Sequence, residues 1–321
     1  MIQVFSNFAD FAPSPQLAAF DAALITRHRA DEHLVAVENR EVVARASLWW
    51  KETPSLEGAR VGAVGHYADT GGEAAKVLLD AACERLLAEG CRVAVGPMDG
   101  NTWRRYRFIT EQASEPPFLM EPDNASEWPA RWQTADFAPL AEYFSALNDD
   151  LFYEDAQVTR AGERLMRSGV TVRALDAARF DEELRRIYEV SVAAFPENFL
   201  YTPLPEAEFV AQYAAVRERV RPELVLLAEH EGRAVGYVFA VPDWLRGAGT
   251  DTVIVKTVAV QPGRVFAGLG TWLVALAQIA ARELGYRRAI HALMHESNNS
   301  RNLSARYAKP FRRYTLYSRS L

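Results

Sequence analysis

The residues with the clearest chemical potential lie between Thr252 and Gly270. An apolar stretch, Thr252 to Val260, is followed by a glycine-containing turn, Gln261 to Gly270, and then by a segment with helical periodicity. Backbone N–H groups of such a turn and of the first helical residues lack intrahelical acceptors, and the helix dipole adds partial positive charge there. Glycine also lets the backbone approach a ligand closely. The order of strand, glycine turn and helix therefore predicts a cradle for a pyrophosphate.

The elements that must position this turn alternate between strand and helix in the second half of the chain. Apolar residues recur at helical spacing from Phe180 to Phe195, and Gly285 is placed to end the helix that follows the turn. We expect strands at 170–175, 224–229, 234–241, 252–260, 288–294 and 312–318, and helices at 180–195, from Pro205 onward, at 271–284 and at 301–307.

The first half repeats this order more faintly. Helices are expected at 15–29 and 73–88, with strands at 34–37, 42–50, 60–68, 93–96 and 137–145, the last of which closes the unit. A repeat of this length indicates duplication of one domain. We therefore predict an α/β (α+β) protein with two tandem domains, 1–147 and 170–321, each a mixed, mostly antiparallel sheet flanked by helices. A charged helix within 148–169 is the expected linker.

Length, charge and cysteine content limit the classes of function. The 321 residues suit two domains of roughly 150 residues each. A formal net charge of −6 argues against nucleic acid as a partner and favours small molecules or peptides. Cys83 and Cys91 fit apolar patterns as buried residues, which indicates a reducing compartment. The N-terminus lacks a signal-peptide pattern, and no stretch approaches the length of a membrane-spanning helix, so we expect a cytoplasmic protein without a membrane partner.

The strand, the pair Gly268-x-Gly270 and the helix, in this order of elements, resemble the GCN5-related N-acetyltransferase (GNAT) family over about 170–321. The repeat is similar to a tandem arrangement of two such domains, as in mycothiol synthase. The resemblance implies acetyl-CoA as co-substrate, with main-chain contacts from Val258 and Val260 to the pantetheine. It also implies that the pyrophosphate is held by the amides of Val265, Phe266, Ala267, Gly268, Leu269, Gly270 and Thr271.

Two features depart from the family pattern. Val265 stands where the family has Gln or Arg, with Arg264 beside it. The family also has an Asn after the fifth strand that contacts the cofactor, for which the candidates are Asn298, Asn299 and Asn302, and a Tyr on the next helix that can protonate the departing thiolate. Tyr307 is the candidate acid, although Pro310-Phe311 follows it one residue early, and a packing role for this Tyr is the alternative.

The general base is less well specified. The family often uses a Glu on the fourth strand, whereas this chain has Asp251 before that strand, Lys256 within it and no acid in its middle. Asp251, Glu197, His291 and Glu296 stay open as candidates, and Glu197 also falls where the family binds the acceptor. His291 and His295 share a strand face but stand too far apart for one tetrahedral ion, so we expect no metal.

The first half is predicted to be degenerate. Its segment equivalent to the glycine turn, 69–75, carries Glu73 where a helix begins, and a carboxylate there repels a pyrophosphate. A loop at 96–107 contains Trp103, Arg104 and further Arg residues. These side chains suit an acidic or planar substrate; the alternative is a solvated loop whose Arg residues balance nearby Glu.

Together these features predict an acetyl-CoA-dependent N-acetyltransferase. The acceptor is expected to be a small amine or a peptide amine that attacks the thioester directly, with the active site in the C-terminal domain. The alternative is a non-catalytic sensor that binds acyl-CoA. A nucleotide-dependent enzyme would need Lys followed by Ser or Thr after the glycines, and Thr271-Trp272 does not supply it. The identity of the acceptor, the acyl chain preference and the oligomeric state stay open.

Overall fold

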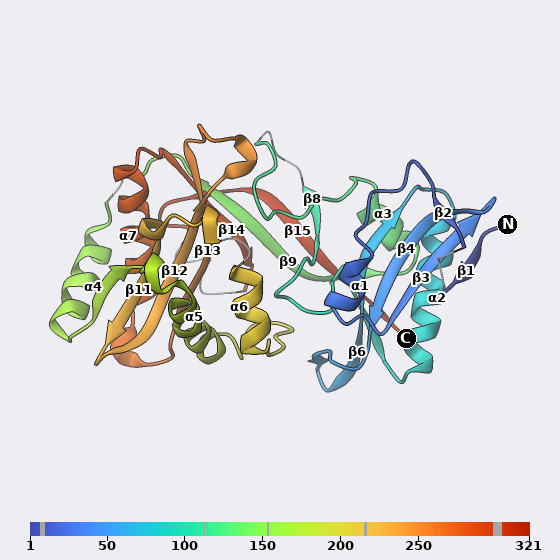
Figure 1. Cartoon of the computed structure of the whole chain (residues 1–321), viewed down its shortest axis with the longest axis horizontal. Coiled ribbons are helices and arrows are strands. Elements are labelled where there is room, and N and C mark those ends of the chain that lie inside the picture. The colour runs from blue at the N-terminus through green and yellow to red at the C-terminus, as the bar shows by residue number, and fades with distance from the viewer. Residues whose placement is uncertain (7–9, 112, 114, 153, 215–216, 298–303) are drawn as a thin grey trace.

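One continuous sheet runs through both halves of the chain (Figure 1). The computed structural model describes residues 1–6, 10–111, 113, 115–152, 154–214, 217–297 and 304–321. Along the main path of the sheet the strands follow the order β1-β3-β4-β6-β7-β15-β9-β14-β13-β12-β11-β10, with β2 on β4, β5 on β6 and β8 on β15.

The N-terminal half comprises β1 (Gln3–Phe5), β2 (Ala12–Pro13), α1 (Ala23–Arg27), β3 (Glu32–Glu38), β4 (Glu41–Trp49), β5 (Ser55–Leu56), β6 (Ala59–Asp69), α2 (Ala74–Ala88), β7 (Val93–Gly96), β8 (Phe108–Glu111), α3 (Trp128–Thr134) and β9 (Ala138–Asn148). Its main core lies between the sheet and helices α2 and α3.

The C-terminal half comprises α4 (Ala156–Arg167), β10 (Thr171–Ala174), α5 (Phe180–Ala194), α6 (Glu206–Ala214), β11 (Val225–His230), β12 (Arg233–Pro242), β13 (Thr252–Val260), α7 (Leu269–Glu283), β14 (Arg288–His295) and β15 (Lys309–Ser320). Short 3₁₀ turns add η1 (Ala177–Arg179), η2 (Arg217–Arg219), η3 (Pro222–Leu224), η4 (Trp244–Arg246) and η5 (Arg264–Phe266). Separate apolar clusters cover the two faces of the sheet, one beneath α5 and α6 and the other beneath α4 and α7.

The two halves repeat one arrangement. Strands β3, β4 and β6 pair antiparallel, α2 follows, and β7 then lies parallel to β6. In the same way β11, β12 and β13 pair antiparallel, α7 follows, and β14 lies parallel to β13. This repeat confirms the predicted fold class of tandem, mostly antiparallel sheets flanked by helices.

The join between the halves differs from the expectation. The strand expected at 137–145 is predicted to close the first unit, but in the structure β9 pairs with β14 and β15. The edge of β7 that β9 would need is occupied by the C-terminal strand, because Tyr317–Ser320 pairs with Val93–Gly96. Each half therefore completes the sheet of the other, and Figure 1 shows β9 and β15 running between them.

The helix expected at 15–29 is also mostly absent, since only α1 is helical in this region. The guanidinium of Arg45 donates hydrogen bonds to the carbonyl oxygens of Ala18 and Ala19, at 2.6 and 3.4 Å. A side chain from β4 therefore binds the carbonyl oxygens that would accept hydrogen bonds within a helix. The segment runs as a loop over the sheet.

By length and composition alone, the segment Arg264–Glu283, which contains η5 and α7, is long and apolar enough to cross a membrane, with a mean hydropathy of 1.4. The expectation that no stretch approaches this length is wrong. In the structure α7 packs on β12 and β13, and buries Leu269, Leu273 and Ala277 among others. A helix that packs in a core satisfies the same test of length and hydropathy, so the segment is weak support for a membrane span.

Candidate active site

The central feature of the C-terminal half is the divergence of two parallel strands. Thr252–Val255 of β13 pairs with Arg288–His291 of β14, and no described residue beyond this point joins the two strands. From Lys256 to Val260, β13 keeps β12 as its neighbour and has no described strand on the other side. The main-chain groups on that side are open to a ligand. Val258 and Val260, the expected pantetheine contacts, both lie in this segment.

The open segment of β13 leads directly to the N-terminus of α7. Gly268 caps the helix with φ +83°, a conformation that favours glycine, and the N–H of Trp272 donates to its carbonyl at 3.0 Å. The N–H groups of Leu269, Gly270 and Thr271 therefore precede the first helical hydrogen bond and have no intrahelical acceptor. Val265, Phe266 and Ala267 form η5 and its end, so the predicted pyrophosphate residues make one continuous turn.

Sequence reasoning missed a cation at this turn. Arg164 on α4 donates a hydrogen bond to the carbonyl of Ala267, and its guanidinium lies beside Gly268. A guanidinium can pair with phosphate oxygens. The charged periodicity of 151–168 indicated a helix, but the position of that helix next to α7 depends on tertiary packing.

A cavity of about 1120 Å³ lies where the strands diverge. Its lining comes from both halves and includes five predicted site residues, namely Val258, His291, Glu197, Trp103 and Arg104. The pyrophosphate turn, Val260, Asp251 and Tyr307 are outside this lining. The structure thus brings the acceptor-side residues of both halves to one cleft, with the turn next to it along β13.

Lys256 is the most distinctive residue of the cleft. It is the extra residue of a bulge in β13, because Thr257 and Val255 oppose the consecutive residues Phe239 and Ala240 of β12. Its side chain lines the cavity, is half-buried and has no carboxylate partner among the described residues. Burial lowers the pKa of the Lys256 ammonium to about 7, and the positive charge of Arg107 adds to this shift. A neutral amine is therefore available near pH 7.

His291 lies at the last position of β14 that pairs with β13. It is buried, its Nδ1 is 3.0 Å from Ser304 Oγ, and its Nε2 has no hydrogen-bond partner among the described residues. Burial lowers the pKa of His291 to about 4, so the imidazole is neutral at pH 7. His295 Nδ1 lies 3.1 Å from the main-chain nitrogen and 2.8 Å from Oγ of Ser297.

Arg107 adds a buried positive charge to the cleft. Its guanidinium lies over the rings of Tyr106 and Tyr143, 3.9 and 4.1 Å from their centroids, and donates to the carbonyl of Leu293 at 3.3 Å. The residue is only 5% exposed, and no carboxylate pairs with it in the described part of the chain. An anionic group of a ligand would satisfy this charge.

Two loop residues expected to hold substrate have structural partners. Arg104 donates to the carbonyl of His28 at 2.7 Å and pairs with Glu208 of α6 at 2.5 Å. Trp103 donates from Nε1 to the carbonyl of Thr202 at 2.9 Å and packs on Phe209. Both line the cleft, but their polar groups join the two halves of the protein.

The remaining candidates are dispersed. Asp251 is exposed before β13 and accepts a hydrogen bond from Thr252 Oγ1 at 2.8 Å. Glu197 is exposed at the cleft, whereas Glu296 pairs with Arg313. Tyr307 is half-buried, with its ring centroid 6.5 Å from that of His291. Asn298, Asn299 and Asn302 lie outside the described residues.

Comparison with known proteins agrees with this geometry. Residues 184–307 match the model of the acetyltransferase (GNAT) family. This part of the chain resembles a GNAT domain. The match includes β13, the turn, α7 and β14, so the predicted resemblance is confirmed for the C-terminal half; the specific likeness to mycothiol synthase stays a prediction.

Two curated relatives and one solved structure extend the comparison. "Bacterial ceramide synthase" of Caulobacter vibrioides is 26% identical over 167 residues, which are 52% of this chain and 44% of that protein. "Protein YghO" of Escherichia coli is 23% identical over 278 residues, covering 76% of this chain and 70% of that protein. The crystal structure of a GCN5-related N-acetyltransferase from Sphaerobacter thermophilus superposes with a TM-score of 0.52 and 13% identity, over 96% of this chain and 97% of that one. The chain thus spans less than half of the ceramide synthase. The Sphaerobacter structure has the same fold as this chain.

The turn provides a direct test of cofactor binding. A residue other than glycine at position 268 would be strained at φ +83°, so we choose Thr271, the third residue of α7, for substitution. Thr271→Asp places a carboxylate among the free N–H groups, which stabilises the helix but repels a pyrophosphate. We expect calorimetry to show CoA binding weakened at least about 10-fold, since helix-terminus charge effects reach about 2 kcal/mol in partly buried sites.

Thr271→Asn is the matched control, since it has nearly the same shape as Asp without the charge. It should bind CoA about as tightly as the wild type, and both variants should melt at or above the wild-type temperature. Equal CoA affinity in the Asp and Asn variants would show that the pyrophosphate lies elsewhere.

Proposed function

We propose that the protein is an acyl-CoA-dependent N-acyltransferase whose active site is the cleft of the C-terminal half. The observation that carries the proposal is the open segment of β13, which runs from the cavity at Lys256 to the free N–H groups of α7. An extended pantetheine along this segment would bring the thioester to the diverging strands. Acetyl-CoA is the proposed donor, as the family resemblance implies.

The proposed reaction is direct attack of an amine on the thioester. The nitrogen lone pair forms a C–N bond to the carbonyl carbon, and the C–S bond then breaks to release the CoA thiolate. Main-chain N–H groups on the open side of β13 are suited to polarise the carbonyl oxygen. Neutral Lys256 takes the proton that the acceptor nitrogen loses, directly or through water. Tyr307 stays the proposed acid for the thiolate.

The length of the acyl group is a separate question. The relative named a bacterial ceramide synthase supports testing long-chain acyl-CoA beside acetyl-CoA. A non-catalytic acyl-CoA sensor would use the same turn without consuming its ligand. Release of free CoA thiol in the presence of amines distinguishes an enzyme from a sensor. The acyl-CoA donors that give turnover then identify the acyl chain length that the enzyme accepts.

The role of Lys256 predicts a pH dependence. A base must be deprotonated to act, so kcat/KM of the wild type should rise with pH and level off above about pH 7, the pKa of Lys256. Lys256→Met should lower kcat/KM by about 10²- to 10⁴-fold and remove this limb of the profile. The measurement is thiol release against pH with an amine that turns over.

Lys309→Met, at an exposed position of β15, is the control and should keep the wild-type profile. A Lys256→Met enzyme with an unchanged pH profile would exclude Lys256 as the base and return the role to Glu197 or His291. Absence of thiol release with every donor and amine would instead refute the proposed activity and favour the sensor.

Arg107 indicates the class of acceptor. Its buried guanidinium lines the same cavity as Lys256 and has no carboxylate partner among the described residues. A carboxylate on the acceptor would supply that partner and hold the amine next to the thioester. We therefore propose a primary amine that also bears a carboxylate, such as an amino acid or a peptide with both groups.

This proposal predicts a difference between paired acceptors. An amino acid should have a lower KM than its uncharged carboxamide, and Arg107→Met should raise the KM of the amino acid by about 10- to 150-fold, the value of a charge-assisted hydrogen bond. Arg160→Met, at an exposed position of α4 outside the lining of the cavity, should change neither KM substantially. Equal KM values for the two acceptors in the wild type would contradict a carboxylate site at Arg107.

A further inference from the structure

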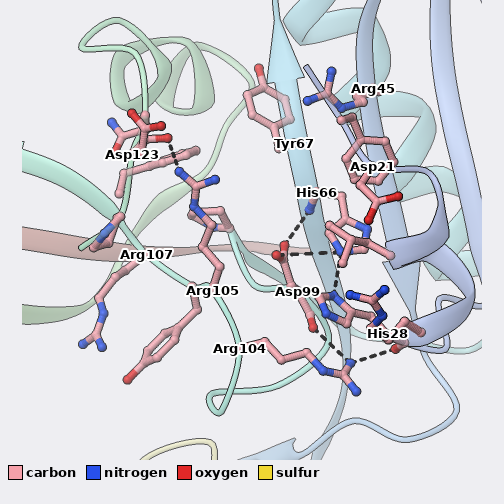
Figure 2. Close-up of a pocket in the computed structure, with 18 of the residues that line it drawn as sticks. Asp21, His28, Arg45, His66, Tyr67, Asp99, Arg104, Arg105, Arg107 and Asp123 are labelled. Carbon is pink, nitrogen blue, oxygen red and sulfur yellow. Dashed lines mark hydrogen bonds and ion pairs between the residues drawn. The ribbon is translucent and has the colours of Figure 1, made fainter. Parts of the chain in front are cut away.

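The N-terminal half has a cavity of its own, of about 900 Å³, which shares the Arg104–Arg107 loop with the cleft (Figure 2). It lies where β6 and β7 diverge, after Val61–Ala63 has paired with Val93–Val95. The cavity therefore occupies the place in the first half that the proposed active site occupies in the second. The predicted degeneracy of this half concerns its pyrophosphate turn and leaves the role of the cavity open.

Three metal-ligating side chains meet in this cavity. His28 follows α1, His66 lies on β6 and Asp99 lies in the loop after β7; all three line the cavity, and one donor atom of each lies within 4.8 Å of the others. Figure 2 shows the three side chains directed toward one another. His28 Nδ1 and His66 Nε2 are hydrogen-bonded at 2.9 Å, a bond that a metal ion would replace, and His66 Nε2 is 3.8 Å from Asp99 Oδ2. Ligand atoms around a tetrahedral zinc ion, bound at about 2.0–2.1 Å, lie about 3.3 Å apart, between these two separations.

The backbone of His66 has an unusual conformation, and its N–H group also positions Asp99. His66 has φ +48°, rare for a residue with a side chain, and lies in a bulge of β6 where the register with β4 shifts. Its N–H donates a hydrogen bond to Asp99 Oδ1 at 2.6 Å. The other carboxylate oxygen, Oδ2, faces the His66 imidazole. Strained residues held in this manner cluster at functional sites. The equivalent bulge in the second half carries Lys256.

A second layer of side chains orients the His66 ring. His66 Nδ1 is 2.9 Å from Ser47 Oγ, which lies 2.7 Å from His33 Nδ1. A proton on His66 Nδ1 that is donated to Ser47 leaves the Nε2 lone pair as an acceptor directed toward His28 Nδ1. Metal-ligating histidines usually donate their other ring N–H in this way.

The local charges are compatible with one divalent ion. Burial is the main cause that lowers the pKa of His28 to about 4 and that of His66 to about 3, so both imidazoles are neutral at pH 7. Neutral imidazole is the form that binds metal. Arg104, Arg45 and Arg105 place positive charge near these ligands, and the ion pair of Arg104 with Glu208 partly offsets its repulsion of a cation. Two imidazoles with one carboxylate favour zinc over magnesium or calcium.

We propose that His28, His66 and Asp99 form a three-ligand site for Zn²⁺ in the N-terminal half, with the fourth coordination position facing the cavity. Three protein ligands with one open position are the pattern of zinc sites that accept a water or a small oxygen or nitrogen ligand. The site departs from the sequence-based expectation of no metal. It is independent of the acyltransferase proposal, because it uses other residues.

The test is metal binding by the full chain after treatment with a chelator. Calorimetric titration with ZnCl₂ should show one equivalent bound. Asp99→Asn keeps an acceptor for the His66 N–H but removes the charge, and His28→Gln removes a half-buried ligand; each should weaken Zn²⁺ binding at least about 100-fold. Ser47→Ala should weaken it by about 10- to 100-fold, the usual effect of losing a second-layer partner.

His230→Gln, at a histidine that contacts Ser168 and is not among the lining residues of the cavity, is the control and should bind Zn²⁺ like the wild type. Co²⁺ added to the stripped wild-type protein should give the intense visible absorption of four-coordinate cobalt, a readout that does not require any variant to fold. Failure to bind Zn²⁺, weak six-coordinate Co²⁺ spectra, or equal affinity in Asp99→Asn and the control would overturn the proposal.

Discussion

The structure depends on the separation of two parallel strands in mid-sheet. β13 and β14 are paired as far as Val255 and His291 and then part. A strand that leaves its partner exposes main-chain groups that must find hydrogen bonds elsewhere. In this protein the exposed edge of β13 faces a cavity at one end and the free N–H groups of α7 at the other. The proposed co-substrate is a molecule of matching shape, extended in its pantetheine and anionic at its pyrophosphate.

The exchange of strands between the halves keeps this gap open. β9 pairs with β14, and β15 lies between β9 and β7. β14 therefore has a complete partner on the side away from β13, which holds it while its other edge is free. The same exchange brings the 102–107 loop of the first half over the cleft of the second. The two halves thus form one site, and the charge of Arg107 acts on Lys256 across the join.

Local patterns were sufficient to predict the strand, the turn and α7, because glycine placement and apolar periodicity are properties of neighbouring residues. The repeat of the two halves was also visible for this reason. The pairing of β9 was not predictable, since it depends on which strand occupies the edge of β7. The loop at 15–29 resembled a helix because its carbonyl partner, Arg45, is distant in sequence.

Some site residues could also be predicted from local sequence, whereas the roles of others depend on tertiary contacts. Val258 and the turn residues follow from their places along the chain, and the structure puts them on one path. Arg104 has the side chain expected of a substrate ligand, but its partners, Glu208 and the His28 carbonyl, come from other elements. Lys256 was visible as a single cation in an apolar strand. Its significance required the bulge and the cavity, which only the folded chain provides.

A crystal structure with CoA bound tests the central claim most directly. The account predicts the pyrophosphate on the N–H groups of Leu269, Gly270 and Thr271, the pantetheine along the open edge of β13, and the sulfur between the diverging strands near Lys256. CoA bound in the N-terminal cavity, or bound with its sulfur away from the gap between β13 and β14, would contradict it.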